Sequence, residues 1–199
     1  MSKKRHVSQQ LIQSYGLFWS VNAVFWGAGG SSNRGALWGW GNRRDKSNGI
    51  VNFRNQIGVY VLYDGYRPIY AGQAGFGDQK QNLFDRLRQH RKDDLANRWD
   101  HFSWFGTRWV TGVGKLSAPA ANTHPTAEVV LNQLEAILIT AIEPGSNRQG
   151  GKWGKAKRYD QKRDPRLGLT QEEMLRVLLK QQNIEKKGEL PDDWNKLLE

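Results

Sequence analysis

Four residues in the middle of the chain have side chains that could bind a phosphate group and move a proton. Tyr60 and Tyr70 each lie in a short β-type run, and Arg86 and His90 stand four residues apart in a segment with helical periodicity. Residues four apart project from neighbouring turns of one helix face, so Arg86 and His90 are expected on the same side. A guanidinium matches two phosphate oxygens, and an imidazole or a phenol can exchange a proton. By themselves, the two tyrosines could be ordinary cross-strand aromatics, and the arginine and histidine could be surface polar residues of a helix.

A carboxylate stands among apolar residues further along the chain. Glu135 lies inside an apolar helix expected over residues 126–142, one turn after Leu131 and three residues before Leu138. A carboxylate among core-facing residues is costly unless it is paired or coordinates a metal ion. Two interpretations therefore stay open for Glu135, a metal ligand and a buried salt bridge with an arginine. By contrast, the acidic pair Asp93-Asp94 lies in polar surroundings and is expected to be a solvated helix end.

The elements that must position these side chains alternate between strand and helix patterns. Residues 57–63 form a β-type run, a turn follows at Asp64-Gly65, and residues 67–72 return as the second strand of a hairpin. Residues 79–92 carry apolar side chains at the spacing of an amphipathic helix. The remaining expected elements are a strand over 101–105, the helix over 126–142, and a helix from the capping box at 170–173 to residue 186. This order is typical of a small α+β module.

The tyrosine motifs occur in an order that is specific as a set. Gly58-Val59-Tyr60 and Tyr70-Ala71-Gly72 are separated by nine residues, and the polar candidates that follow them along the chain are Arg86, His90, Glu135 and Asn147. Over residues 56–150 this arrangement resembles the GIY-YIG nuclease superfamily. The sequence departs from the family pattern at Val59 and Ala71, which replace other apolar residues. Gln73 stands where several members carry a lysine.

The resemblance implies a fold, a reaction and a role for each site residue. The implied fold is a central three-stranded antiparallel sheet flanked by helices, with Gly58 and Gly72 as close-packing positions. The implied reaction is hydrolysis of DNA phosphodiester bonds with one Mg²⁺ or Mn²⁺ ion per active site. By this resemblance, Glu135 would ligate the metal and Arg86 would bind the scissile phosphate. Tyr60 would accept a proton from water with help from Tyr70, and His90 would share that proton or bind the phosphate. Asn147 would orient Glu135 or the substrate, and its alternative role is a helix-end cap.

Charge is distributed unevenly along the 199 residues. The net charge is +11, yet residues 57–150 are close to neutral, so the basic excess lies in the two flanks. Such flanks suit binding to a phosphate backbone, although solvated loops of the same composition are the alternative. We therefore expect a Trp/Gly/Arg-rich N-terminal extension over 1–55, the nuclease module over 56–150, and a basic segment with a helical tail over 151–199. The basic residues expected to contact DNA are Arg43, Arg44, Arg148, Lys152, Lys155, Lys157 and Arg158.

Composition excludes several classes of protein and leaves several functions open. The absence of cysteine excludes disulfides, thiolate zinc sites and a cysteine nucleophile, and no apolar run is long enough to span a bilayer. The tryptophans near the N-terminus could fill a small core or stack on unpaired bases. We expect a cytoplasmic DNA endonuclease of restriction or phage defence, as a homodimer or a partner subunit of a defence system. The alternatives are a repair, recombination or mobile-element nuclease of the same fold, and a catalytically silent nucleic-acid-binding module.

Overall fold

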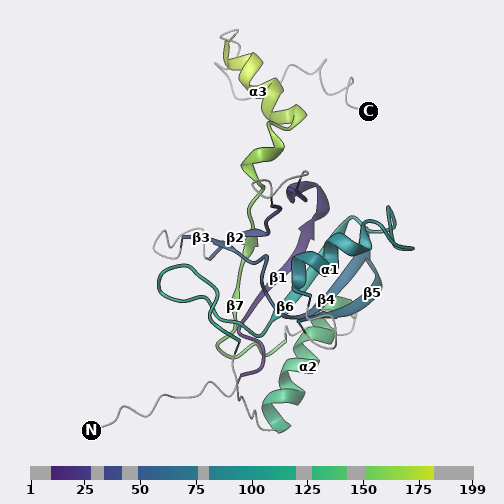
Figure 1. Cartoon of the computed structure of the whole chain (residues 1–199), viewed down its shortest axis with the longest axis vertical. Helices are drawn as coiled ribbons and strands as arrows, with labels where there is room; N and C mark the ends of the chain where they lie inside the picture. Colours follow the sequence, from purple (N-terminus) through teal and green to yellow (C-terminus); the bar gives the residue numbers. More distant parts are fainter. Residues whose placement is uncertain are drawn as a thin grey trace. The chain divides into compact units, whose positions relative to one another are not determined.

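The structure is a computed structural model that describes residues 10–27, 34–41, 49–75, 81–119, 127–142 and 151–181. Its contacts divide the chain into two units, Met1–Asp164 and Pro165–Glu199. The α+β class expected from the sequence is confirmed (Figure 1). None of the described helices combines the length and the apolar character that a membrane span requires.

A five-stranded sheet forms the centre of the first unit. Its order is β5-β4-β6-β1-β7, and its strands are β1 (Ser14–Ser20), β4 (Gly58–Asp64), β5 (Arg67–Ala74), β6 (His101–Gly106) and β7 (Lys157–Arg158). All neighbours pair antiparallel except β1 and β7, which run parallel. The expectation of a three-stranded sheet is therefore wrong, because two segments outside residues 56–150 add strands, β1 beside β6 and β7 beside β1. The basic residues of β7 thus end up at one edge of the sheet and the β5 hairpin strand at the other.

The expected hairpin is present as β4 and β5. Strand β4 is rich in β-branched and aromatic residues, and the chain reverses at Gly65, which has a positive φ of 57°. In the register of the pair, Tyr60 faces Gly72 and Leu62 faces Tyr70. Because side chains alternate between the two faces of a sheet, Tyr60 and Tyr70 project from the same face.

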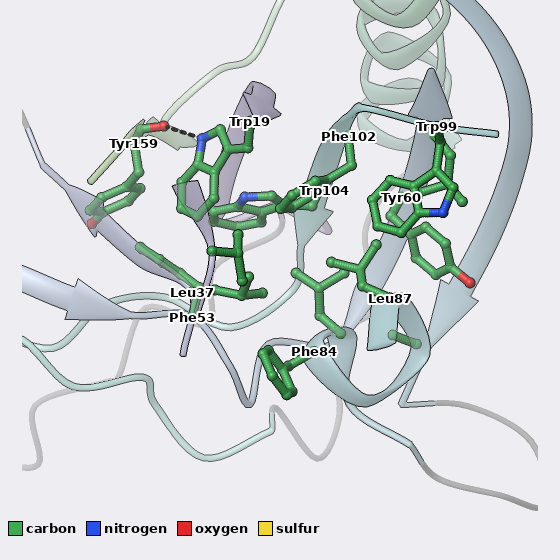
Figure 2. Packing of buried hydrophobic residues seen from close by; sticks show 14 of the residues in the cluster. Trp19, Leu37, Phe53, Tyr60, Phe84, Leu87, Trp99, Phe102, Trp104 and Tyr159 are labelled. Carbon is green, nitrogen blue, oxygen red and sulfur yellow. Dashed lines mark hydrogen bonds between the residues drawn. The ribbon is translucent and has the colours of Figure 1, made fainter. Parts of the chain in front are cut away.

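Helix α1 (Leu83–His90) covers that face. Asn82 caps its N-terminus by accepting a hydrogen bond from the Asp85 amide, and Leu83, Phe84 and Leu87 are buried against the sheet. The core between α1 and the sheet is largely aromatic, and its labelled members in Figure 2 include Trp19, Phe53, Tyr60, Phe102 and Trp104. Trp19 is only 1% exposed. For Trp19 the structure therefore supports the core interpretation over base stacking.

Helix α2 (Ala127–Ile142) belongs to the opposite face of the sheet. Ile137 and Ala141 pack in a second cluster with Val61 and Tyr63, the β4 residues that point away from Tyr60. The buried Gln133 side chain accepts hydrogen bonds from the Leu11 and Ile12 amides, at 3.0 Å each. These contacts fix which side of α2 faces the sheet. The sheet therefore separates the α1 layer, which contains Tyr60, from the α2 layer.

The remaining described elements are a small second sheet, two short 3-10 helices and helix α3. The second sheet has the order β3-β2-β8. Helix α3 begins as expected, because Thr170 and Glu173 form a reciprocal capping box. The bounds of these elements are η1 (Val21–Ala23), β2 (Trp38–Trp40), β3 (Ile50–Asn52), β8 (Asp160–Gln161), η3 (Pro165–Leu167) and α3 (Gln171–Gln181).

Candidate active site

Tyr60, Tyr70 and His90 meet on the α1 face of the hairpin. The Tyr60 hydroxyl lies 2.8 Å from His90 Nε2. The Tyr70 ring centre is 4.7 Å from that of His90 and 6.2 Å from that of Tyr60. Tyr60 and His90 are buried, whereas Tyr70 is partly exposed. Two strands and one helix thus bring together three of the residues that the sequence singled out.

The two motif glycines pack closely, as expected. A Cβ atom at Gly72 would collide with the Tyr60 hydroxyl and would lie 2.8 Å from Tyr70 Cε1. Gly58 has a φ of 149°, and a Cβ there would collide with the Phe105 carbonyl oxygen of β6. Gly72 therefore leaves the space that the Tyr60 hydroxyl occupies, and Gly58 lets β4 approach β6.

Arg86 is the cationic member of the cluster. It is partly buried, and its Nη1 atom donates a hydrogen bond of 2.8 Å to Gln89 Oε1. Burial raises the pKa of Tyr60 to about 12, while the charge of Arg86 and a hydrogen bond with it act in the opposite direction. A contact with Tyr70 adds to the effect of burial. Arg86 therefore lies close enough to Tyr60 to stabilise a developing negative charge on its oxygen.

Asp93 is a member of the site that the sequence reasoning missed. Its Oδ2 atom lies 2.7 Å from His90 Nδ1, and its Oδ1 atom accepts a hydrogen bond of 3.0 Å from the Leu95 amide. The expectation that Asp93 is a solvated helix end is therefore wrong, because the turn that follows α1 directs the carboxylate back toward the imidazole. The available signal was the spacing of three residues between His90 and Asp93, which places both on one side of a helix end.

Glu135 does not lie where the sequence suggested. Its side chain is exposed, as are Leu131 and Leu138 on the same side of α2, at 65% and 56%. The expectation that Glu135 sits among core-facing residues is therefore wrong. The reason is that Gln133, Ala136 and Ala141 form the buried side of the helix instead. Among the described residues no hydrogen bond or ion pair joins Glu135 to the Tyr60 cluster, from which the sheet separates its helix.

This placement bears on the implied metal ion. In the part of the chain that the structure describes, no three His, Cys, Asp or Glu side chains gather as a metal-binding group. Glu135 is presented to solvent from the α2 layer, and Asp93 is engaged with His90. The described residues therefore do not fit a metal site that Glu135 shares with Tyr60.

The basic residues expected to contact DNA divide into two groups. Lys152, Lys155, Lys157 and Arg158 are all exposed, in or just before β7 at the sheet edge. Arg158 Nε lies 3.6 Å from Asp160 Oδ1, an exposed contact that leaves the guanidinium accessible. The other candidates, Arg43, Arg44, Arg148 and the site residue Asn147, lie outside the described residues.

The fold and the cluster define a small α+β protein with a tyrosine, histidine and arginine site at the edge of its sheet. No protein-family model, curated protein or solved structure matches the chain. Function must therefore be inferred from the residues and their geometry.

Proposed function

We propose that this protein is an endonuclease that hydrolyses DNA phosphodiester bonds. One observation carries the proposal, namely the meeting of Tyr60, Tyr70 and His90, with Arg86 beside them, on the hairpin and α1. These four residues are the ones that the resemblance to GIY-YIG nucleases implies for the strands and first helix. They combine a phosphate-binding cation with groups that exchange protons, which is what phosphodiester hydrolysis requires.

The burial of each residue suggests which of them meets the substrate. Arg86 and Tyr70 are partly exposed, whereas Tyr60 and His90 are buried behind them. The guanidinium of Arg86 would hold two oxygens of the scissile phosphate. The resemblance implies that Tyr60 takes a proton from water with help from Tyr70. Because Tyr60 is buried, this proton would reach it through the Tyr70 hydroxyl.

The proton then moves along a chain of groups that each accept one proton and release one. The attacking water gives a proton to Tyr70, Tyr70 gives its own to Tyr60, and Tyr60 gives its own to His90 Nε2. The hydroxide forms a bond to phosphorus, and the bond from phosphorus to the leaving oxygen breaks. The leaving alkoxide takes a proton from solvent, and the imidazolium of His90 releases one to solvent, so that one water is consumed overall.

The proposal also covers a metal ion and a biological setting. The resemblance implies a divalent ion that would supply positive charge to the phosphate and the leaving oxygen. Because the described residues do not fit a metal site shared by Glu135 and Tyr60, the roles proposed for Arg86, Tyr70, Tyr60 and His90 do not rely on this ion. Restriction or phage defence is the setting that we propose, with a homodimer or a partner subunit completing a double-strand cut. A repair, recombination or mobile-element nuclease is the alternative within the same chemistry.

The exposed basic residues at β7 would bind the DNA backbone. Strand β7 is three strands from β4 in the sheet, which is on the order of 15 Å at the usual spacing of strands. A DNA duplex is wide enough to contact both places at once. Lys152, Lys155, Lys157 and Arg158 would then bind backbone phosphates while Arg86 engages the scissile one.

A second function is favoured by one specific observation. Because Glu135 is exposed on the far side of the sheet from Tyr60, the protein could be a catalytically silent nucleic-acid-binding module. Such a module would retain the basic edge and the hairpin but would not cut DNA.

The two functions are separated by a cleavage assay with matched arginine variants. Supercoiled plasmid, linear duplex and single-stranded DNA are incubated with Mg²⁺, with Mn²⁺ and with EDTA. We expect the parent and Arg88→Ala, which removes an exposed arginine of the same helix, to cut at rates within about 3-fold of each other. Arg86→Ala should lose about 100-fold or more, since it removes the phosphate clamp. Cutting by none of the proteins on any DNA form, with binding intact, would establish the silent module instead.

A further inference from the structure

We propose that Asp93 is a positioning residue that holds His90 in the tautomer protonated at Nδ1, so that Nε2 is free to take the proton of Tyr60. This inference rests on the proposed function for its consequence in catalysis, but the tautomer itself can be observed without any cleavage. It assigns a role to a carboxylate that the nuclease resemblance does not include.

The protonation state of Asp93 determines which atom donates in its hydrogen bond with His90. Partial burial acts to raise the pKa of this carboxyl, but hydrogen bonds from the Leu95 amide and from His90 outweigh it and lower the pKa. An ionised carboxylate can only accept hydrogen bonds. Its Oδ2 atom lies 2.7 Å from His90 Nδ1, so Nδ1 must be the donor of that bond.

The role of Nδ1 determines the role of the other ring nitrogen of His90. In the neutral ring one nitrogen donates and the other accepts. If Nδ1 donates to Asp93, then Nε2 accepts, and the group 2.8 Å from it is the Tyr60 hydroxyl. Tyr60 therefore donates to His90, which leaves the lone pairs of the Tyr60 oxygen directed toward Arg86 and Tyr70. This is the logic of the Ser-His-Asp triad, with a tyrosine hydroxyl in place of the serine.

Hydrogen bonds from neighbouring residues hold Asp93 and His90 in this arrangement. Asp93 is held from two sides, because its amide donates 3.2 Å to the Gln89 carbonyl while its Oδ1 atom accepts from Leu95. The His90 carbonyl in turn accepts 3.3 Å from Trp99 Nε1. The groups that face the His90 ring are Tyr60 from β4, Tyr70 from β5, and Asp93 from the turn, with Arg86 one helical turn before it. Asp93 is the one carboxylate among the described residues that hydrogen-bonds the ring.

For catalysis, the consequence is that His90, not Tyr60, is the group that finally accepts the proton. With a pKa of about 12, the Tyr60 phenol stays protonated near neutral pH and cannot itself be the base. His90 can accept the hydroxyl proton of Tyr60 as Tyr60 receives one from Tyr70, and the negative charge of Asp93 stabilises the imidazolium that forms. Tyr60 is then a proton carrier, and the His90–Asp93 pair is the base of the reaction.

The chain offers a matched control one residue further on. Asp94 is an exposed carboxylate of the same turn, and no hydrogen bond or ion pair of its side chain occurs among the described residues. Asp93→Asn keeps an Oδ1 atom that can accept from the Leu95 amide, so the turn is preserved. Its amide group can donate to Nδ1, which would move the imidazole proton to Nε2. Asp94→Asn makes the same chemical change without touching His90.

The test measures the tautomer and the reaction separately. Nitrogen-15 NMR of the full chain near neutral pH should show His90 protonated at Nδ1 in the parent and in Asp94→Asn, and at Nε2 in Asp93→Asn. In the cleavage assay, Asp93→Asn should lose about 100-fold or more in kcat with KM within about 3-fold, whereas Asp94→Asn should stay within about 2-fold of the parent.

The imidazole tautomer is a readout that a purely structural role would not move. A residue that only stabilised the turn would leave the same ring nitrogen of His90 protonated in Asp93→Asn as in the parent. Circular dichroism verifies that both variants are folded. A parent His90 protonated at Nε2, or equal kcat values for the two asparagine variants, overturns the inference. If the parent cuts no DNA, the proposed function fails, and the NMR result alone decides the role of Asp93.

Discussion

Glycine at position 72 determines how closely strand β5 can approach the Tyr60 hydroxyl. The Tyr60 side chain is fully buried, and its oxygen occupies the space where a Cβ of residue 72 would lie. A methyl group at position 72 would therefore displace the Tyr60 hydroxyl, which hydrogen-bonds to His90. The glycine of the second tyrosine motif thus has a packing reason that does not depend on any resemblance.

Replacing Gly72 by alanine should therefore damage both stability and the site. We expect Gly72→Ala to lower the free energy of unfolding by about 1–3 kcal/mol, since the added methyl must displace Tyr60 or strand β5. The matched control is Ala71→Ser, which alters an exposed residue on the opposite face and should stay within about 0.5 kcal/mol of the parent. Urea denaturation measures both. Equal midpoints for the two variants would show that Tyr60 does not occupy the position described.

At the scale of elements, the two helices differ in how well their sequences indicated their orientation. Helix α1 has its apolar residues on one side, and the structure buries Leu83, Phe84 and Leu87 as that pattern predicts. Helix α2 is apolar on most sides, so periodicity could not select its buried face. The selection is made by Gln133, whose amide oxygen caps the Leu11 and Ile12 amides, and by Ala136, which is small enough to contact Gly151.

This orientation of α2 can be tested with two substitutions on its opposite sides. Ala136 is fully buried, and a Cβ on Gly151 would collide with it, so Ala136→Leu should overpack this contact and cost about 1–3 kcal/mol. Leu138 is 56% exposed, so Leu138→Ser should change stability by no more than about 0.5 kcal/mol. Urea denaturation of the two variants provides the measurement. A Leu138→Ser variant that is the less stable of the two would mean that α2 turns its leucines, and with them Glu135, toward the sheet.

For the molecule as a whole, local patterns predicted the elements, but not how distant segments join them. The hairpin, α1, β6, α2 and the start of α3 all occur where periodicity and turn residues placed them. The five-stranded sheet was not predictable, because its two added strands pair with distant segments. Strand β1 pairs with β6, as in Ser14 with Gly106, and β7 pairs with β1, as in Ser14 with Lys157. In the site, spacing within the hairpin and α1 located Tyr60, Tyr70, Arg86 and His90. Asp93 was missed because its role depends on the turn after α1, and Glu135 was misplaced because its role depends on a helix orientation.

In the proposed function, a basic edge of the sheet would bind DNA, and a buried proton chain would support its cleavage. The exposed lysines and Arg158 at β7 would determine where DNA binds, and the Tyr60 cluster would determine whether it is cut. Binding and cutting should therefore respond to different substitutions.

The most direct measurement is the single-turnover rate of cleavage of an end-labelled DNA duplex by Tyr60→Phe and by Tyr66→Phe. The two variants each remove one hydroxyl, from the buried Tyr60 or from Tyr66, which is 87% exposed in the hairpin turn. With DNA affinity unchanged in both, Tyr60→Phe should cut about 100-fold or more slowly, whereas Tyr66→Phe should match the parent within about 2-fold. Equal cleavage rates for Tyr60→Phe and the parent would contradict the claim that this cluster is the hydrolytic centre.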